Sequence, residues 1–462
     1  MIRIFKHYIS SAYLWLIIAE WLIFYLSMFL GSDVRFINVS SWYSDEHIVD
    51  ASIIFSSSLT LACMGLGLYR RSLVWEDYNL VLRVCVSFAL AAAFIISVYY
   101  LFPKYLIARS VFIYALVFAF LGMMLSRYFF YRYVSLNKIM RRVLVLGTGK
   151  RAKQLMTINN EYVHKGFVLV GYIHVGEDKS HIDSDLVIGQ TQDLRRIVDE
   201  YDVEEIVVAL DDKRNALPLD KLLDCKTIGV HIIDLLSFYE REQGLILLDA
   251  DTLNWVVFSD GFEFSGVKSV TKRIIDLIAS LGLLAVTWPF MLLTALAILM
   301  ENGLKSPVLY KQIRVGENNK PFTVMKFRSM CTDAEKNGAQ WAQENDDRVT
   351  RVGRFIRKCR IDELPQIFNV LKGNMSFVGP RPERPEFVDG FEKRIPFYAE
   401  RHRVKPGITG WAQLCYPYAA DEEDTINKLQ YDLYYVKNYT LFLDISIILG
   451  TVEVILWGRG AR

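Results

Sequence analysis

A pair of adjacent carboxylates stands out as candidate chemistry in this chain. Asp362 and Glu363 lie just before Pro365, which suits the first turn of a helix, and Gly373 suits the position after the end of that helix. A helix N-terminus stabilises ionised carboxylates and also attracts phosphate. The pair could therefore act on a phosphate group, although ordinary pairing of acidic side chains with the helix dipole explains the same pattern.

Basic residues around this pair could hold a phosphate-bearing substrate. Lys326 and Arg328 are two residues apart in a strand-like alternation, so their cations point to one side, next to the hydroxyl of Ser329. Such a cluster suits a pyrophosphate, and a solvated basic edge is the alternative. Arg381 lies between two prolines, which stiffen its loop. The further candidates in the neighbouring stretches are Arg314, Glu383, Arg403 and Lys405.

The stretch 348–360 predicts a basic amphipathic helix. Apolar residues recur at helical spacing, and arginines occupy the other faces. Such a helix lies on anionic lipid, and a buried core helix is the alternative. The apolar set is Val349, Val352, Phe355, Ile356 and Cys359.

Four apolar runs before residue 135 predict a bundle of membrane-spanning helices upstream of these residues. A membrane-spanning helix needs ~20 mostly apolar residues. The second run contains three serines and is the weakest of the four, and Glu20 in the first run should face another helix. The four runs are Ile9–Leu30, Ile53–Leu68, Val81–Phe102 and Ile107–Phe130.

Loop charges orient this bundle. Basic residues precede the first run and follow the second and fourth runs, whereas the loop between the first two runs is acidic. By the positive-inside rule both ends face the cytoplasm, so everything after residue 140 starts there. The basic residues are Arg3, Lys6, Arg70, Arg71, Arg127, Arg132, Lys138, Arg141 and Arg142.

An α/β domain with a parallel sheet is expected after the bundle. Strands are predicted at Val143–Leu146, Phe167–Ile173 and Glu205–Leu210, with a helix near Asp193–Glu200. The first strand runs into a G-x-G-x-x-A turn at 147–152, which suits a phosphate at a helix N-terminus. This Rossmann-like domain could bind a dinucleotide, or it could be a structural or regulatory scaffold.

A membrane-anchored nucleotide-sugar dehydratase would also place a Rossmann domain after four spans. That chemistry needs a Tyr-x-x-x-Lys pair inside the domain. The pair occurs in this chain only at Tyr100 and Lys104, within the membrane region. The dehydratase interpretation therefore lacks its catalytic group.

A fifth apolar run, Ile274–Met300, is long enough to span a membrane but carries Pro289 near its centre. Basic residues flank both of its ends, so a full crossing would violate the charge rule. We expect a re-entrant helix at about 272–300, broken at Pro289, that enters and leaves on one face. An ordinary fifth span is the alternative.

Composition excludes two broad classes. Of the 462 residues, 52% are apolar, so the chain is too hydrophobic for intrinsic disorder. The net charge of +2 lacks the basic excess of a bulk nucleic-acid binder. The six cysteines have neither disulfide-framework nor zinc-site spacing, which indicates inert thiols in a reducing compartment.

The region from Thr271 to about Val454 resembles the bacterial sugar transferases that prime polysaccharide synthesis, the polyprenyl-phosphate hexose-1-phosphate transferases. The matching blocks are Lys-Arg-x-x-Asp (272–276), Lys-Phe-Arg-Ser-Met (326–330), Asp-Glu-Leu-Pro-Gln (362–366), Val-Gly-Pro-Arg-Pro-Glu (378–383) and Lys-Pro-Gly-Ile-Thr-Gly-Trp-Ala-Gln (405–413). With the upstream spans and α/β domain, the whole chain looks like the long members of that family. The continuation 414–420 resembles the subgroup associated with exopolysaccharide and exosortase systems. Trp288 stands before Pro289 where many members have Ser.

The resemblance implies transfer of a sugar-1-phosphate from a UDP-sugar to undecaprenyl phosphate, with release of UMP. Asp362 would be the nucleophile, near a Mg2+ ion, with Glu363 as the second carboxylate. The remaining site residues would bind substrate, and Lys272, Arg273 and Asp276 would organise the start of the membrane helix. These substrate-binding candidates are Lys272, Arg273, Asp276, Arg314, Lys326, Arg328, Ser329, Arg381, Glu383, Arg403 and Lys405.

The predicted architecture is therefore a transmembrane α-helical bundle (1–135), a Rossmann-like α/β domain (141–262) and an α/β monotopic catalytic domain with a re-entrant membrane helix (268–462). The resemblance also implies the inner membrane, a cytoplasmic catalytic domain and a homodimer. An inactive scaffold of polysaccharide assembly and a glycosyltransferase that releases UDP stay as alternatives.

Overall fold

The structure is a computed structural model. It describes residues 2–4, 7–9, 11–36, 45–69, 78–105, 107–133, 140–161, 167–176, 180–211, 217–248, 256, 259–262, 266–303, 306–331, 348–416 and 421–457. Some basic loop residues used above to orient the bundle, Lys6, Arg70, Arg71 and Lys138, lie outside these ranges.

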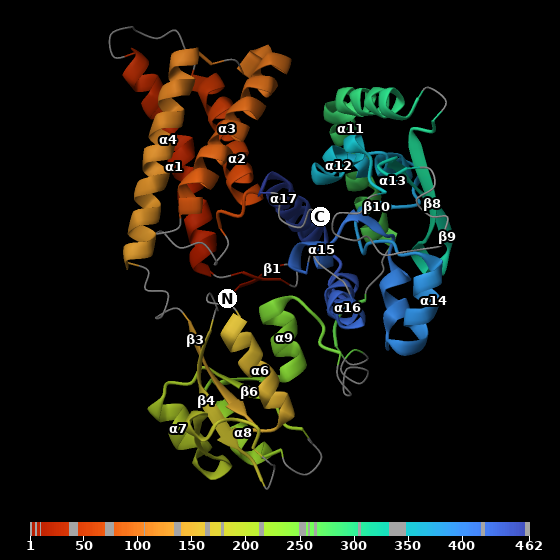
Figure 1. The fold of residues 1–462 in the computed structure, drawn as a ribbon. Helices are drawn as coiled ribbons and strands as arrows, with labels where there is room; N and C mark the ends of the chain where they lie inside the picture. Colours follow the sequence, from red (N-terminus) through yellow and green to blue (C-terminus); the bar gives the residue numbers. More distant parts are fainter. Residues whose placement is uncertain are drawn as a thin grey trace. The chain divides into compact units, whose positions relative to one another are not determined.

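Four long helices in the first part of the chain correspond to the four apolar runs (Figure 1). A short antiparallel pair, β1 (Ile2–Ile4) and β2 (His7–Ile9), precedes them. All four are long and apolar enough to cross a membrane, the serine-containing second helix included. They are α1 (Ser11–Phe36), α2 (Asp45–Gly65), α3 (Tyr78–Leu101) and α4 (Arg109–Tyr133).

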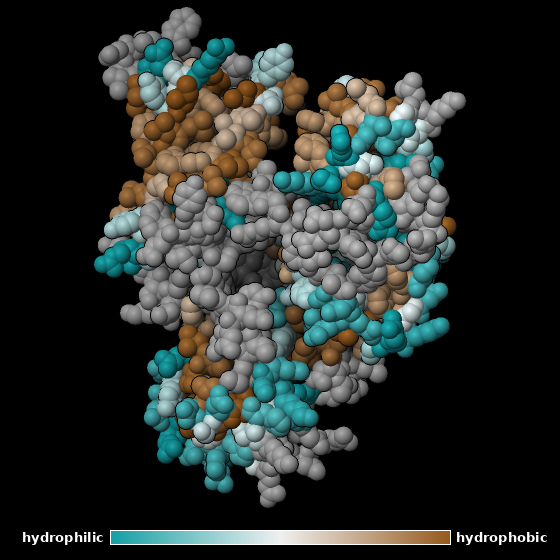
Figure 2. Space-filling view, in the orientation of Figure 1, coloured by the Kyte–Doolittle hydropathy of each residue, from teal (hydrophilic) through white to brown (hydrophobic). Residues whose placement is uncertain are grey.

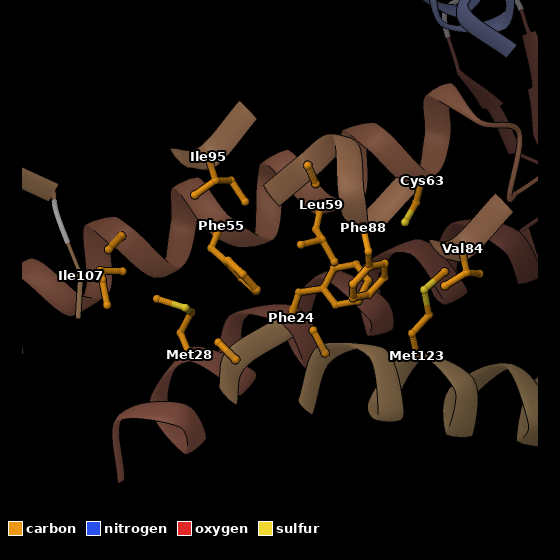
Figure 3. Close-up of a cluster of buried hydrophobic side chains, with 14 of the residues drawn as sticks. Phe24, Met28, Phe55, Leu59, Cys63, Val84, Phe88, Ile95, Ile107 and Met123 are labelled. Atoms are coloured by element: carbon orange, nitrogen blue, oxygen red, sulfur yellow. The ribbon is translucent and has the colours of Figure 1, made fainter. Parts of the chain in front are cut away.

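The interior of this bundle is an aromatic and aliphatic core (Figure 3). Phe88 meets Phe24 and Phe120 edge to face, with ring centroids 6.0 and 5.7 Å apart. Leu59 and Cys63 of α2 are fully buried in the same core. The outer face of the bundle is coloured largely as apolar (Figure 2). A helix that is apolar on all sides is the pattern of a membrane span.

One ion pair lies inside the bundle, where the sequence placed Glu20 against another helix. The Glu20 carboxylate accepts from Arg127 Nε at 2.9 Å and from Nη2 at 3.2 Å, and neither side chain is exposed. Tyr69 donates its hydroxyl to the same carboxylate at 2.7 Å. The prediction for Glu20 is confirmed, because a buried charge requires a partner of this kind.

The α/β part is a five-stranded parallel sheet with the strand order β5-β4-β3-β6-β7. The predicted strands and the parallel sheet are confirmed, and two short strands were missed by the sequence analysis, β5 and β7. The strands are β3 (Arg141–Leu146), β4 (Phe167–His174), β5 (Val187–Gln190), β6 (Glu205–Val208) and β7 (His231–Asp234). The helices are α6 (Lys150–Glu161), α7 (Leu194–Glu200), α8 (Leu219–Thr227) and α9 (Leu235–Gln243).

The chain divides into two compact units, Met1–Gln243 and Gly244–Arg462, and the second carries the candidate site. Its core joins four short strands to the helices around them. The strands are β8 (Leu309–Val315), β9 (Pro321–Phe327), β10 (Ser376–Val378) and β11 (Gly407–Thr409). The helices are α11 (Gly266–Asn302), α12 (Arg351–Lys358), α13 (Gln366–Lys372), α14 (Pro385–Arg394), α15 (Trp411–Cys415), α16 (Glu422–Lys437) and α17 (Leu441–Trp457).

Helix α11 contains the fifth apolar run and Pro289, and it is one continuous helix of 37 residues, so the expected break at Pro289 is not observed. Pro289 has no N–H to donate, and Thr287 donates its hydroxyl to the Leu283 carbonyl at 2.7 Å. Four side chains, Asp276, Ser280, Thr294 and Ile298, are buried, whereas large apolar side chains on the other faces are exposed. The helix therefore packs on the rest of its unit along one narrow stripe.

Candidate active site

Asp362 and Glu363 lie in a single 3₁₀ turn, Ile361–Glu363, that leads through Leu364 and Pro365 into α13. Arg360 begins the turn in the left-handed region, at φ 54°. Gly373 ends α13 at φ 87°, as the sequence predicts, and Pro365 precedes the first residue of α13 by one position. The carboxylates therefore sit on a short, sharply formed turn at a helix start.

Glu363 is surrounded by cations. Its Oε1 accepts from Lys326 Nζ at 2.9 Å and from Arg381 Nη2 at 2.8 Å, and Arg360 Nη1 lies 3.7 Å from its Oε2. Burial alone would raise the pKa of this carboxyl, but the charges of Arg381, Lys326 and Arg360 outweigh burial and hold the pKa far below its ordinary value. Glu363 is therefore ionised at neutral pH.

The neighbouring carboxylate behaves in the opposite way. The Asp362 side chain is half-buried and makes no hydrogen bond or ion pair with the residues that the structure describes. Burial, and then the negative charge of Glu363, raise the pKa of Asp362 to about 6, against the lowering effect of Lys326, Arg381 and Arg357. Two adjacent carboxyls with pKa values pushed apart are typical of an acid–base or nucleophile pair.

A buried amide fixes the strand that carries Lys326. Asn369 of α13 accepts a hydrogen bond from Met325 N–H at 3.0 Å and donates one to the Thr323 carbonyl at 2.7 Å. It thus pairs with the free edge of β9 as a neighbouring strand would. Because Asn369 follows Glu363 by less than two helical turns, this pairing fixes Lys326 beside Glu363.

A buried arginine holds the loop that carries Arg381. Arg401 donates to the Arg381 carbonyl at 2.9 Å and to the Tyr398 hydroxyl at 2.9 Å, and it pairs with Asp432 Oδ2 at 2.7 Å. Both charged side chains of the pair are less than a tenth exposed. The Pro-Arg-Pro loop is therefore held from behind as well as stiffened by its own prolines.

The structure does not bring all the predicted substrate-binding residues to the carboxylates. Arg314 donates to the Pro382 carbonyl at 3.1 Å and pairs with Glu383 at 3.4 Å, so these two candidates bind each other and brace the Arg381 loop. Arg403 is exposed and pairs with Glu400 at 3.0 Å. Lys405 is half-buried, and the contacts of the described residues do not join its side chain to Asp362 or Glu363.

Arg328 and Ser329 lie just beyond the end of β9. Arg328 Nη1 is buried and has no hydrogen-bond partner among the described residues, so one of its donors is available to a ligand. The Ser329 carbonyl accepts from Thr350 N–H at 3.1 Å, at the start of α12. A Cβ at Gly353 would lie only 1.9 Å from that carbonyl oxygen, so α12 can approach closely only because residue 353 is glycine.

The three residues at the start of α11 bind protein groups. Lys272 pairs with Asp444 at 2.7 Å and donates to the Val378 carbonyl at 2.9 Å. Arg273 donates to the last carbonyls of α13, and Asp276 accepts from the Ser376 hydroxyl and the Phe377 N–H, each at 2.9 Å. The three side chains fasten α11 to α13, β10 and α17.

Helix α12 forms over 351–358, within the predicted stretch, with the Thr350 side chain as its N-cap. Gly353 and Ile356 face inward, and Arg351, Arg354, Phe355 and Lys358 are exposed. A basic face with a 62% exposed Phe355 supports the amphipathic interpretation. Glu301, at the end of α11, accepts from the Arg351 and Val352 N–H groups at 2.8 and 3.1 Å.

Within the described part of the chain, no group of three or more Asp, Glu, His or Cys side chains is placed to hold a metal ion. A Mg2+ ion is usually bound in proteins by one or two carboxylates together with substrate phosphates and water. The unpartnered Asp362 carboxylate fits that role, whereas Glu363 is committed to its cations.

Asn369 and Arg401 are the functional candidates that the sequence analysis missed. Arg401 lies four residues before the block 405–413, and in the sequence it looks like the nearby Arg403. The structure distinguishes the two, because Arg401 pairs with the distant Asp432 whereas Arg403 pairs with Glu400. Asn369 lies on the buried face of α13. An asparagine among the apolar residues of a short helix is unusual, and this is the feature of the sequence that could have identified it.

Helices of membrane length, together with a carboxylate pair set among cations, define a membrane protein with a centre suited to phosphate chemistry. Sequence comparisons then identify its family. The profile of bacterial sugar transferases matches residues 267–458, and a profile described as a CoA-binding domain matches residues 65–231. The chain belongs to the bacterial sugar transferase family.

Three relatives illustrate the similarity. The UDP-N-acetylgalactosamine-undecaprenyl-phosphate N-acetylgalactosaminephosphotransferase of Aeromonas hydrophila is 52% identical over 198 residues, which are 43% of this chain and 46% of that protein. The undecaprenyl-phosphate glucose phosphotransferase of Komagataeibacter xylinus is 33% identical over 348 residues, 70% of this chain and 61% of that protein. The UDP-glucose:undecaprenyl-phosphate glucose-1-phosphate transferase of Klebsiella pneumoniae is 33% identical over 332 residues, 70% of this chain and 69% of that protein.

Proposed function

We propose that this protein transfers a sugar-1-phosphate from a UDP-sugar to undecaprenyl phosphate and releases UMP, as the priming step of exopolysaccharide synthesis. The observation that carries the proposal is that the two adjacent carboxylates have different surroundings. Lys326 and Arg381 neutralise the charge of Glu363, whereas Asp362 has no partner among the residues that the structure describes. The names of the relatives support the same donor and acceptor.

In the proposed reaction the Asp362 carboxylate attacks the sugar-bearing phosphorus of the donor. A bond forms between the carboxylate oxygen and this phosphorus, the bond from the phosphorus to the bridging oxygen breaks, and UMP leaves with that oxygen. An oxygen of undecaprenyl phosphate then attacks the same phosphorus and releases Asp362. Dividing the displacement in two allows donor and acceptor to occupy the site in turn.

The charges around the turn suit these steps. Lys326 and Arg381 pair with Glu363, and their charges also act on Asp362, so we expect them to contact the pyrophosphate. Arg328 adds a donor that has no partner among the described residues. Mg2+ bound by Asp362 and the substrate phosphates would neutralise the pyrophosphate charge. Lys272, Arg273 and Asp276 act through α11, whose start they fasten, and Arg314 and Glu383 act by bracing the Arg381 loop.

We also propose that α11 is re-entrant and that the catalytic unit lies on the cytoplasmic face of the inner membrane. Its first turns bind α13 and β10, and near its other end Ile298 packs with Phe327 and Ile356. Because one compact unit binds both ends of the helix, both ends belong on the same side of the membrane. The apolar faces between them are coloured brown in Figure 2, and α12 would lie on the headgroups.

The five-stranded sheet supports the further proposal of a Rossmann-like domain. Its order, β5-β4-β3-β6-β7, is that of the first five strands of the doubly wound 3-2-1-4-5-6 sheet. A homodimer, expected from the resemblance, stays a prediction that the oligomeric state in detergent would test.

Labelled donors test the reaction directly. Purified protein with Mg2+, undecaprenyl phosphate and a UDP-sugar labelled at the β-phosphorus should give labelled lipid and UMP. Without acceptor, the wild-type protein should become labelled, and Asp362→Asn should not. Asp389→Asn, an exposed carboxylate on α14, is the matched control. Release of UDP would instead indicate a glycosyltransferase, and a protein inert with a panel of UDP-sugars would be a scaffold.

Cysteine accessibility tests the path of α11. The exposed cysteines, Cys85, Cys331 and Cys359, are first replaced by serine. Gly266→Cys and Asn302→Cys then place one thiol at each end of the helix. Labelling of both thiols from the cytoplasmic side supports the re-entrant path, and labelling from opposite sides refutes it.

A further inference from the structure

The turn between β3 and α6 lies where doubly wound sheets bind the phosphates of their ligands. Strands β3 and β6 are neighbours in the sheet, and the chain leaves β3 through Gly147, Thr148 and Gly149 into α6. In such sheets a pyrophosphate sits in this crevice and is bound by the first N–H groups of the helix. The description of the matching profile, a CoA-binding domain, leads to the same expectation.

In this chain an aspartate already binds those N–H groups. Asp211 Oδ2 accepts from Lys150 N–H and Oδ1 accepts from Arg151 N–H, each at 2.9 Å. Asp211 comes three residues after the end of β6, and it is exposed to solvent. Its carboxylate therefore occupies the N–H groups at the start of α6 while it stays in contact with solvent.

The glycines of the turn make room for the protein's own chain. A Cβ at Gly149 would lie 2.3 Å from Asp211 Oδ2. Gly147 has φ +123°, and a Cβ there would lie 2.7 Å from the Ala209 carbonyl oxygen. Both glycines are thus required by the close approach of residues 209–211, and a ligand is not needed to explain them.

The other polar groups of the turn are also engaged within the domain. The Thr148 carbonyl accepts from His181 N–H at 2.7 Å, and its hydroxyl lies 2.9 Å from His174 Nδ1. Arg151 is buried, and its guanidinium donates to the Leu210 carbonyl at 3.2 Å. The Arg151 guanidinium, which could have paired with a phosphate, therefore binds a carbonyl of the domain.

We propose that the Asp211 carboxylate takes the place of a ligand phosphate at the start of α6, so that this domain does not bind CoA or another pyrophosphate-bearing cofactor there. A second anion would meet both an occupied pair of N–H groups and the repulsion of a carboxylate within contact distance. The residues present do not fit the cofactor that the profile's description suggests. In this proposal the α/β domain is a structural or regulatory scaffold.

Binding measurements on the full chain in detergent test this inference. The titrations use protein in which Lys326 and Arg381 are replaced by alanine, so that the proposed donor site does not bind pyrophosphate. In this background, isothermal titration with CoA, and separately with inorganic pyrophosphate, should detect no saturable binding up to the millimolar range while Asp211 is intact. Adding Asp211→Ala should tighten pyrophosphate binding at least tenfold. Asp211→Asn removes the charge but keeps one acceptor for the helix, and it replaces the alanine variant if that variant fails to fold.

Asp220→Asn, at an exposed carboxylate in the first turn of α8, controls for the change in net charge and should gain nothing. Saturable binding of CoA or pyrophosphate to protein with the donor site disabled and Asp211 intact would overturn the inference. It would also be overturned if folded Asp211 variants bound pyrophosphate no better than that protein, because another group would then exclude the ligand.

Discussion

Replacing Asp362 by Asn should inactivate the protein and at the same time stabilise it. The side chain is held in surroundings that disfavour its charge, since burial and Glu363 raise its pKa from 3.8 to about 6. At neutral pH the folded protein must nevertheless keep Asp362 ionised. Asparagine has the same shape and no charge, so the folded state no longer bears this cost.

The magnitude follows from linkage between protonation and folding. Between pH 3.8 and about 6 the folded state binds more protons at Asp362 than the unfolded state does, so stability falls as the pH rises through this window. A shift of about 2 pKa units corresponds to at most ~3 kcal/mol above pH 6. The side chain is half-buried, so screening reduces the expected gain for Asp362→Asn to roughly 1–2 kcal/mol.

The adjacent carboxylate provides a matched control of opposite sign. Glu363→Gln removes the partner of Lys326 and Arg381, which are 23% and 39% exposed, and leaves two cations facing each other. Removing one member of a buried ion pair is strongly destabilising, and the partial exposure places the cost at about 2–3 kcal/mol. Two carboxyl-to-amide changes at neighbouring positions should therefore move stability in opposite directions.

Thermal unfolding of the full chain in detergent measures both effects. At pH 7.5 the midpoint of Asp362→Asn should rise by roughly 2–8 °C and that of Glu363→Gln should fall. At pH 4.5 the advantage of Asp362→Asn should shrink to about a third, because the wild-type carboxyl is then largely protonated. An unchanged or lowered midpoint for Asp362→Asn at pH 7.5, in a protein that is otherwise folded, would refute the reasoning about its surroundings.

Four further outcomes are expected. Transfer activity should fall as the pH drops through about 6, because the nucleophile must be ionised, and a pH–rate profile measures this. Arg401→Lys cannot bind Tyr398, Arg381 and Asp432 at once, so activity should fall at least tenfold and the acidic limb should move to higher pH, since Arg381 otherwise lowers the Asp362 pKa. Asn369→Leu leaves two backbone groups of β9 unpaired and should cost about 2–4 kcal/mol in denaturant unfolding, whereas Asn369→Asp keeps the bond from Met325 and should cost less. Glu20→Gln leaves the Arg127 guanidinium unpaired inside the bundle and should lower the unfolding midpoint, whereas Glu20→Gln combined with Arg127→Met should recover much of the loss.

Long elements and local turns were predictable because their signals are local. Four apolar runs became α1–α4, and the cap by Thr350 and the left-handed Gly373 follow from single residues. The short edge strands β5 and β7 were missed, since four residues carry too little periodicity to stand out.

The acidic partner of each basic side chain could not be predicted in the same way. Arg314, Lys272 and Arg381 look alike in the sequence, and their roles depend on partners 69, 172 and 18 residues away. Arg381 pairs with Glu363 in the carboxylate turn, whereas Arg314 pairs with Glu383 and Lys272 pairs with Asp444. Periodicity carries no information about such pairings, because they are set by how the elements pack.

The apolar contacts of α11 have a consequence for how the catalytic unit could be obtained in water-soluble form. Ile361 and Leu364, which flank the two carboxylates, pack against the cluster that Ile298 of α11 forms with Phe327 and Ile356. Trimming α11 to remove the membrane attachment would take away one wall of the reaction centre and the Glu301 cap of α12. A soluble enzyme would instead require redesign of the exposed faces of α11 with polar residues, while its buried stripe is kept intact.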